Sequence, residues 1–297
     1  MLIGGNDILL FVLASFSLAI VCDVVFHVLV AKRREVDLAD PSMSAALTVY
    51  GFLRMYVPFT SVMLLYYVSG YGVEGFIDFV KNQVVMSRQA LITFLFAPFY
   101  TYMALLLFIA LGLLFRIVGF EKTRSLYKTG GKLKTVLFIV GLGYIASITI
   151  NALFAFGEEI GWRSFLFMKL LGKLGFWNAV FVTGVVWGLW HAPIVLILKP
   201  KSPIIGRVNP WYSVFSYIIL CITLSIPESI LLLETNSILP PSSLHGSVNA
   251  VWRATEPLTK MREERKTRDL LKASVIAIAS WLVSIVVMTT ILKIIVH

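Results

Sequence analysis

Long apolar stretches alternate with short polar segments along the whole chain. A helix needs about 20 consecutive apolar residues to cross a bilayer. Stretches of roughly this kind occupy residues 8–31, 46–69, 91–115, 136–157, 176–198, 211–233, 237–252 and 270–296. They are continuous apolar runs, which is typical of membrane helices. The pattern therefore predicts an all-α, polytopic membrane bundle with about eight transmembrane helices around a conical or bundled core that encloses a polar cavity.

Composition agrees with this reading and excludes other classes. Hydrophobic residues make up 58% of the chain and charged residues 14%, against about 25% charged residues in a soluble domain. A soluble globular enzyme or a disordered protein would not carry so much apolar surface. The two cysteines, Cys22 and Cys221, both lie inside apolar stretches, so a disulfide framework is excluded. We expect one integral-membrane domain over residues 1–297.

The charges predict how the chain lies in the membrane. The formal net charge is +10, from 26 Lys and Arg against 16 Asp and Glu. The loops after the first, third, fifth and seventh stretches hold 19 of the basic residues, and the opposite side holds 6. Basic loops stay in the cytoplasm, so these loops are predicted to be cytoplasmic, with both termini outside. The positive charge then faces anionic lipid, and the bilayer, not a nucleic acid, is the expected partner.

Two segments between the spans carry their own patterns. Residues 70–87 mix aromatic and charged positions, which predicts an amphipathic helix at the outer interface. Residues 253–272 mix charges of both signs. They are predicted to be a solvated cytoplasmic loop or helix, with an anionic-lipid or substrate-recruiting surface as the alternative.

Acids appear where the apolar pattern places the membrane interior. A charged side chain there costs about 2.5–3.5 kcal/mol, so it marks a candidate site. Glu158, Glu159 and Arg163 follow the fourth apolar stretch, and apolar residues resume at once. Glu159 and Arg163 share a helix face and form a candidate ion pair, which leaves Glu158 over. We expect the helix to continue to about Leu171, bending or packing closely at the glycines 141, 143 and 157.

Two further spans carry polar pairs at the same i, i+4 spacing. Trp187 and His191 share a face in the fifth span, and Pro193 is expected to kink that helix beside the histidine. His245 and Asn249 share a face in the seventh span. Each cluster alone is also explained by structural pairing or interhelical hydrogen bonds.

A fourth polar pair lies in the first span. Asp23 and His27 have the same spacing, and no other candidate chemistry lies near them. They are predicted to form a structural pair.

Together the first three clusters predict a polar chamber inside the bundle. Glu158 with His191 could deprotonate a water molecule. His245 with Asn249 could donate hydrogen bonds to an oxyanion. These are the parts of a peptide hydrolase that lacks a nucleophilic Ser or Cys. Because His191 and Asn249 lie toward the cytoplasmic ends of their spans, the chamber is predicted to open toward the cytoplasm.

At these residues the sequence resembles the CPBP family of intramembrane proteases, which includes CAAX prenyl endopeptidases of the Ras-converting-enzyme type. The family signature is E-E-x-x-x-R, then F-x-x-x-H, then H-x-x-x-N. Here these motifs read Glu158-Glu159 with Arg163, Trp187 with His191, and His245 with Asn249. Trp187 departs from the usual phenylalanine. The resemblance covers about residues 136–254, the expected catalytic core, and gives Glu159, Arg163 and Trp187 supporting roles.

The resemblance implies a glutamic-type endopeptidase. Glu158 and His191 would activate the hydrolytic water, and His245 and Asn249 would stabilise the oxyanion. The implied substrate is a prenylated or other membrane-bound protein or peptide, cut near its C-terminus.

Two alternatives remain open from the residues alone. A glutamate with two histidines is a possible zinc set. The absence of H-E-x-x-H and the shortage of acceptors for both histidines argue against it, so no cofactor is expected. Buried acids and histidines also occur in transporters, and a non-enzymatic scaffold of the same fold is possible too. A transporter should show paired interrupted helices, and the sequence shows no internal repeat.

Overall fold

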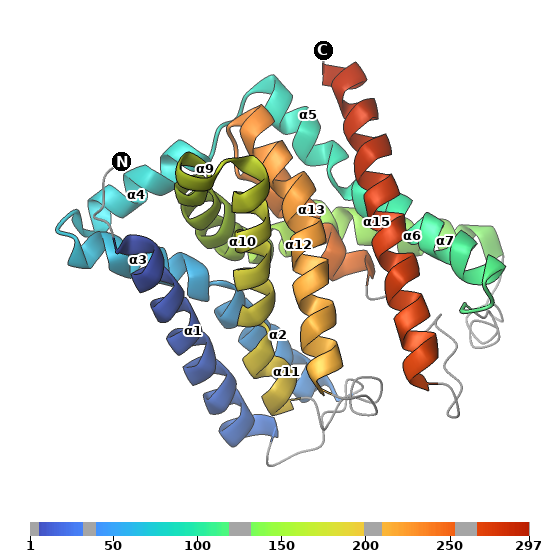
Figure 1. The fold of residues 1–297 in the computed structure, drawn as a ribbon, viewed down its shortest axis with the longest axis horizontal. Coiled ribbons are helices and arrows are strands. Elements are labelled where there is room, and N and C mark those ends of the chain that lie inside the picture. The colour runs from blue at the N-terminus through green and yellow to red at the C-terminus, as the bar shows by residue number, and fades with distance from the viewer. Residues whose placement is uncertain (1–5, 32–39, 119–131, 199–209, 253–265, 297) are drawn as a thin grey trace.

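The computed structural model describes residues 6–31, 40–118, 132–198, 210–252 and 266–296. The described residues are mostly helical (Figure 1). In chain order the helices are α1 (Asp7–Phe26), η1 (His27–Ala31), α2 (Pro41–Met55), α3 (Val57–Val68), α4 (Gly72–Gln83), α5 (Arg88–Phe96), α6 (Pro98–Leu114), α7 (Lys132–Ile148), α8 (Ile150–Glu159), η3 (Ile160–Phe167), α9 (Met168–Leu174), α10 (Phe176–Trp190), α11 (Ala192–Leu198), α12 (Pro210–Thr235), α13 (Leu239–Val251) and α15 (Lys266–Val296).

Seven continuous helical stretches among the described residues are long and apolar enough to cross a membrane. They are Asp7–Val30, Pro41–Val68, Arg88–Leu114, Leu137–Leu174, Phe176–Ile197, Pro210–Thr235 and Arg268–Val296. Each corresponds to one predicted span, so the all-α polytopic membrane fold is confirmed. Most of the basic residues on which the predicted orientation depends, including those of 253–265, lie outside the described residues.

The seventh predicted span, residues 237–252, differs from the prediction. Residues 237–252 contain α13, which has 13 residues. At 1.5 Å per residue it is about 20 Å long, shorter than the hydrocarbon core of about 30 Å. Nearly all of its side chains from Pro240 to Val248 are buried. An apolar sequence pattern cannot distinguish a short helix enclosed by protein from one that faces lipid.

The fourth span is one long, bent helical stretch, as predicted. It continues through α8, η3 and α9 and ends at Leu174. The bend lies at Thr149, which leaves helical geometry and donates its Oγ1 to the carbonyl of Ile145 at 2.6 Å. Such back-bonding bends helices. The glycines were expected to let the helix bend or pack closely, and two of them pack closely: a Cβ at Gly157 would lie 2.8 Å from the Met55 carbonyl oxygen, and one at Gly143 would lie 3.0 Å from the Tyr102 hydroxyl.

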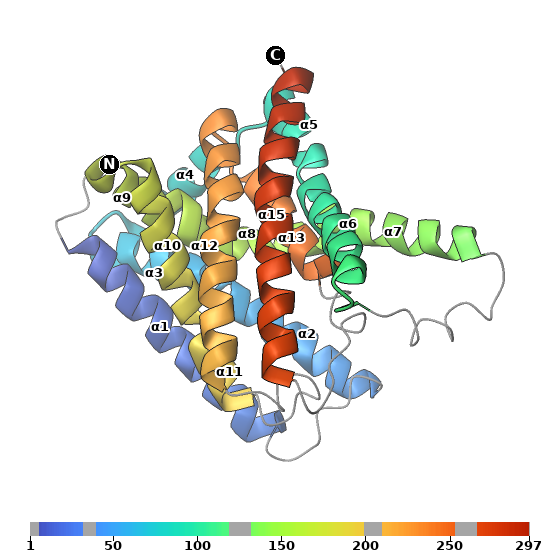
Figure 2. The same ribbon diagram turned by 45° about the vertical axis from the view of Figure 1, so that its right-hand side comes forward.

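Several helices pack against the bent one, among them α3, α10 and α13. α12 packs between α10 and α15, and α13 packs against α7 and α8 (Figures 1 and 2). α1 and α15 run in opposite directions between the same two ends of the bundle. Gly184 and Gly188 allow the closest approach, since a Cβ at either would lie 2.4 Å from a Cα atom of α12. Small residues at this spacing let membrane helices pack backbone to backbone.

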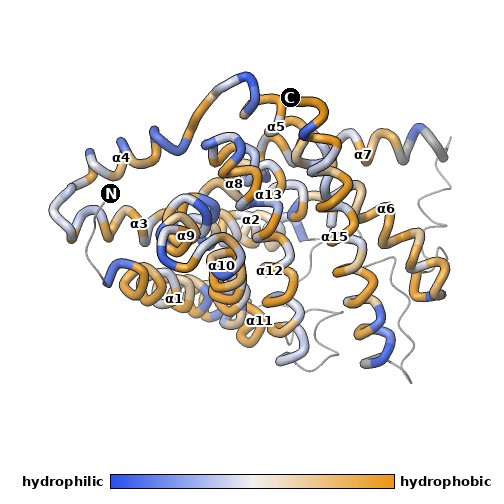
Figure 3. Tube along the Cα trace, turned by 45° about the horizontal axis from the view of Figure 1, so that its top comes forward, coloured by the Kyte–Doolittle hydropathy of each residue, from blue (hydrophilic) through white to orange (hydrophobic). Residues whose placement is uncertain are grey.

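The outer surface is apolar and the core contains polar groups. Large side chains such as Leu106, Phe138 and Val286 are more than half exposed, at 64%, 65% and 68%. Apolar positions dominate most helices in Figure 3, whereas α4 alternates between hydrophilic and hydrophobic positions. α4 confirms the predicted helix within residues 70–87 and buries Phe76 and Phe79. This inversion fits a protein whose solvent is lipid.

The contact between α13 and α8 gives a stability prediction. A Cβ at Gly246 would lie 2.7 Å from the Ala152 nitrogen and 2.8 Å from the Ser147 oxygen. Backbone atoms cannot move aside easily, so Gly246→Ala is expected to cost about 1–3 kcal/mol. Gly141→Ala is the control, because nothing lies within 4 Å of its Cβ position. Melting of detergent-purified protein should show a lower Tm for Gly246→Ala alone, and equal Tm values for the two variants would contradict this packing.

Candidate active site

The two motif acids lie where the helix changes its winding. Glu158 and Glu159 end α8, and the π-helical segment η3 begins at Ile160. Their exposed fractions are 3% and 0%. π-Helical turns are often found at functional sites. The helix continues past both acids, so they lie inside the bundle, as the sequence predicts.

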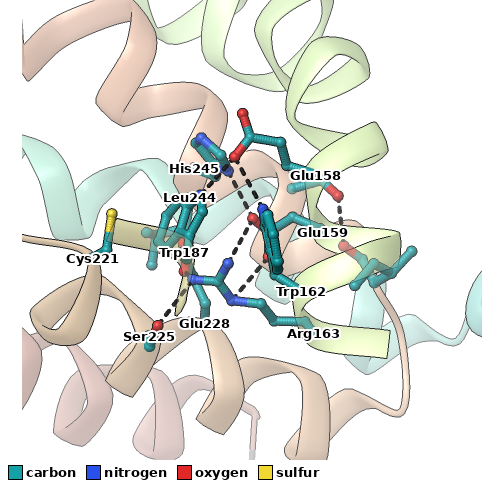
Figure 4. A network of polar contacts seen from close by, with 12 residues as sticks. Glu158, Glu159, Trp162, Arg163, Trp187, Cys221, Ser225, Glu228, Leu244 and His245 are labelled. Atoms are coloured by element: carbon teal, nitrogen blue, oxygen red, sulfur yellow. Dashed lines mark hydrogen bonds and ion pairs between the residues drawn. The ribbon is translucent and has the colours of Figure 1, made fainter. Parts of the chain in front are cut away.

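Glu158 is held through one of its two oxygens. Its Oε2 accepts a hydrogen bond from Trp187 Nε1 at 2.6 Å and another from Trp162 Nε1 at 3.3 Å (Figure 4). An indole N–H only donates, so both bonds require acceptor lone pairs on this oxygen. These bonds leave the second oxygen, Oε1, for another partner. The sequence placed Trp187 beside His191 but gave no sign that it bonds Glu158.

His245 is oriented by the second acid. Its Nδ1 lies 2.7 Å from Glu159 Oε1, and its ring centroid lies 5.1 Å from that of Trp187. Glu159 is also in an ion pair with Arg163. A carboxylate in such a pair accepts hydrogen bonds, so Nδ1 is the protonated nitrogen of His245. Its Nε2 is then the atom that can act on a substrate.

Arg163 joins both sides of the site. It contacts Glu159 through Nη1 and Nε, at 3.3 and 3.2 Å, so the predicted pair is present. Its Nη2 donates to Glu228 of α12 and to Ser225 Oγ at 3.3 Å. The guanidinium carbon lies 4.1 Å from the centroid of the Trp187 ring. Sequence reasoning missed Glu228, although an acid inside the apolar stretch 211–233 was a usable signal.

His191 lies at the break between α10 and α11. Its backbone N–H bonds the Gly188 carbonyl at 3.1 Å, so the Trp187 carbonyl loses its regular helix partner. The His191 ring takes that place, with Nδ1 2.9 Å from the Trp187 oxygen. A carbonyl only accepts, so Nδ1 carries the proton and Nε2 has the free lone pair in the neutral ring. Tyr217 stacks on this ring, with centroids 5.0 Å apart and planes 12° apart.

Asn249 lies one turn beyond His245 on α13 and is half-buried. The i, i+4 spacing keeps both on one face of the helix, as predicted. Asn249 is not among the residues that the close view of the network labels (Figure 4).

The structure thus gathers most of the predicted site around one tryptophan. The acids, Arg163, Trp187 and His245 form one buried network. His191 adjoins it through its bond to the Trp187 backbone. Among the described residues, Glu158 and His191 share no hydrogen bond.

A second buried network corrects the pairing predicted for the first span. Asp23 accepts from Arg54 Nε at 2.8 Å and from Tyr50 at 2.6 Å. Arg54 also donates to the Trp190 carbonyl at 2.9 Å, next to His191. His27 Nδ1 has no hydrogen-bond partner among the described residues. The predicted Asp23–His27 pair is therefore wrong, because a buried arginine needs the carboxylate as its counterion.

The described residues contain one cluster whose ligand atoms are close enough to share a metal ion. It comprises Glu159, Glu228 and His245, with ligand atoms within 4.8 Å of one another. It differs from the alternative considered from the sequence, one glutamate with two histidines, because it contains two glutamates and one histidine. Arg163 already binds both of these acids, so a positive group occupies the place that a metal ion would need.

The comparisons with known proteins bear on the region that carries these motifs. Residues 134–251 match the family model described as type II CAAX prenyl endopeptidase Rce1-like. The predicted family resemblance is confirmed. The Rce1-like region contains every predicted site residue, from Glu158 to Asn249.

One curated relative supports the same family. The chain is 26% identical over 87 residues to CAAX prenyl protease 2 of Methanococcus maripaludis. The matched part is 28% of this chain and 32% of the relative. The family match covers the region around the site, and the match to this relative spans about a third of the relative's length.

Proposed function

We propose that this chain is an intramembrane peptidase that hydrolyses a peptide bond near the C-terminus of prenylated CAAX-type or related membrane-bound substrates. The observation that carries the proposal is the meeting of three motif helices at Trp187, which contacts Glu158, Arg163 and His245. The substrate class follows the names of the matching family and relative.

The first chemical step uses the two unoccupied basic atoms. Glu158 Oε1 and His191 Nε2 are the candidates to take a proton from water, because the other atom of each group is engaged. The water oxygen then bonds to the peptide carbonyl carbon. When the C–N bond breaks, the same proton passes to the leaving amine, so the base is restored.

The oxyanion that forms when water adds to the carbonyl carbon needs hydrogen-bond donors. His245 bonds Glu159 through Nδ1, so it can donate from Nε2 only when the ring carries both protons. The Asn249 amide can donate in any protonation state. Glu159, which is itself paired with Arg163, fixes the His245 ring through Nδ1 and leaves Nε2 for the substrate.

We propose that this hydrolysis runs without a metal ion. Arg163 lies between the carboxylates of the candidate cluster and supplies their positive charge. A zinc-dependent mechanism is the second candidate, because the Nδ1 atom of each histidine has a hydrogen-bond acceptor. For His191 it is the Trp187 carbonyl oxygen, and for His245 it is Glu159. Histidines that bind a metal ion usually donate their other ring N–H to such an acceptor. The shortage of acceptors that the sequence suggested is therefore no longer an argument against zinc.

The test is cleavage by purified protein. A prenylated peptide with a C-terminal CAAX sequence is incubated with protein in detergent, and products are identified by mass spectrometry. We expect release of a short C-terminal peptide, slower cleavage of the same peptide without its prenyl group, and no dependence on bound zinc or on a chelator. Absence of cleavage of the prenylated peptide contradicts the proposed function, and loss of activity on chelation favours the zinc candidate.

The hydrogen bond from Trp187 to Glu158 gives a prediction for a single substitution with a moderate effect on turnover. Trp187→Phe restores the residue usual in the family motif and removes the Nε1–H donor. A hydrogen bond to a charged group is worth about 1.5–3 kcal/mol, so turnover should fall about 10- to 100-fold with little change in KM.

Trp190→Phe is the matched control for that variant. Trp190 is also buried, but its Nε1 donates to the Ser15 carbonyl of α1 at 3.1 Å. Its loss should lower Tm and leave the turnover of the folded protein near wild type. If both variants show the same turnover, the Trp187–Glu158 bond has no role in catalysis.

A further inference from the structure

Glu228 is a fully buried acid that belongs to none of the three motifs. Its exposed fraction is 0%, and it follows Pro227 inside α12. A carboxylate in such a place is costly unless a positive group pairs with it. Arg163 is that group, and Ser225 of the same helix binds the same guanidinium nitrogen. α12 therefore binds Arg163 through two residues, Glu228 and Ser225.

The contact between Glu228 and Arg163 affects how strongly Arg163 competes with His245 for Glu159. Glu159 Oε1 receives both Arg163 Nη1, at 3.3 Å, and His245 Nδ1, at 2.7 Å. The two donors compete for one carboxylate. Arg163 already contacts both Glu159 oxygens, through Nη1 at 3.3 Å and Nε at 3.2 Å. With no second acid, the whole positive charge of the guanidinium would attract this one carboxylate and draw it closer. By holding Nη2, Glu228 limits that pull and leaves Oε1 close to the histidine.

We propose that Glu228 is a positioning residue of the active site, which anchors Arg163 to α12 so that Glu159 stays free to orient His245. The predicted effect on activity rests on the proposed function. The predicted geometry of Arg163, Glu159 and His245 does not depend on it. Glu228 acts through Arg163 and Glu159 and touches no substrate.

The first arm of the test is Glu228→Gln. It keeps the shape of the side chain and removes the charge. We expect Arg163 to move closer to Glu159 than its present 3.2 and 3.3 Å, and the His245 ring to shift. A displacement of catalytic groups by about 1 Å or less is expected to lower kcat by about 10- to 100-fold. The KM for the prenylated peptide should stay within about twofold, because no substrate contact is lost.

The second arm removes the arginine as well. In Glu228→Gln combined with Arg163→Gln, no guanidinium competes for Glu159, so the Glu159–His245 bond should return. The double variant is expected to be more active than Glu228→Gln alone. A merely structural role predicts the reverse, because two substitutions would then damage the core more than one.

The matched control is Glu234→Gln. Glu234 lies on the same helix and pairs with Lys293 at 3.7 Å, with its side chain 29% exposed. The same chemical change there should leave kcat at the wild-type level.

A readout that needs no activity separates this proposal from the proposed function. In protein labelled with nitrogen-15 histidine, the His245 Nδ1 signal should shift in Glu228→Gln and return in the double variant. An unshifted signal, or a double variant no better than the single one, overturns the proposal. Loss of a bound metal ion in Glu228→Gln also overturns it, since Glu228 would then be a metal ligand.

Discussion

Replacement of Glu158 by glutamine is expected to reduce the single-turnover rate of peptide cleavage by about 10²–10⁴-fold. Glutamine is nearly the same size and can still accept a hydrogen bond from Trp187 through its amide oxygen. Its nitrogen would take the place of Oε1, the oxygen that the two indoles leave free. The amide cannot accept a proton from water, so the base is lost while the surroundings persist.

The measurement needs purified variants with matched folding. Tm in detergent should stay within a few degrees of wild type, since the Glu158 side chain forms no ion pair with the residues that the structure describes and its hydrogen bonds can be kept. Glu74→Gln, on the exposed face of α4, is the control for the substitution itself. If Glu158→Gln kept most of its activity, Glu158 would not be the base.

His191→Ala is expected to have an effect of the same order. The ring is fixed by the Trp187 carbonyl and by stacking on Tyr217, which directs Nε2 as the free basic atom. Tyr217→Phe keeps the stacking and serves as its comparison. An active His191→Ala protein would leave Glu158 to act alone.

The sequence predicts the course of a helix and one of the two ion pairs proposed within a helix. The i, i+4 rule placed Glu159 with Arg163, and that ion pair is present. The apolar residues after Arg163 predicted a helix that continues, and it ends at Leu174. Both depend only on helical periodicity and on the cost of breaking a helix inside a membrane.

Contacts between helices were not predictable in the same way. Trp187 bonds Glu158, Arg163 binds Glu228, and Asp23 binds Arg54. Which faces meet depends on the rotation and depth of whole helices, which close glycine contacts such as Gly188 with α12 help to set. Helical periodicity gives neither the rotation nor the depth of a helix. For this reason the sequence paired Asp23 with His27 of the same span instead of with Arg54.

Loss of either oxyanion donor is expected to be the second large effect. Removing one such donor costs about 10²–10³-fold in turnover, so Asn249→Ala should be strongly impaired. Its substrate binding should change little, because the donor acts on charge that develops in the transition state. His245→Ala should be at least as severe, since a charged imidazole forms the stronger hydrogen bond. A fully active Asn249→Ala protein, or one whose sole defect is weaker binding, contradicts this role.

Glu159→Ala distinguishes an orienting acid from a purely structural one. The sequence alone suggests that this change leaves Arg163 unpaired and harms folding. In the structure Arg163 keeps Glu228 and Ser225, whereas His245 loses its Nδ1 partner. The expected defect is therefore catalytic, with a modest fall in Tm. Because Glu159 would act through His245, Glu159→Ala combined with His245→Ala should be no slower than His245→Ala alone. Additive losses in single-turnover rate would mean that Glu159 acts independently of His245.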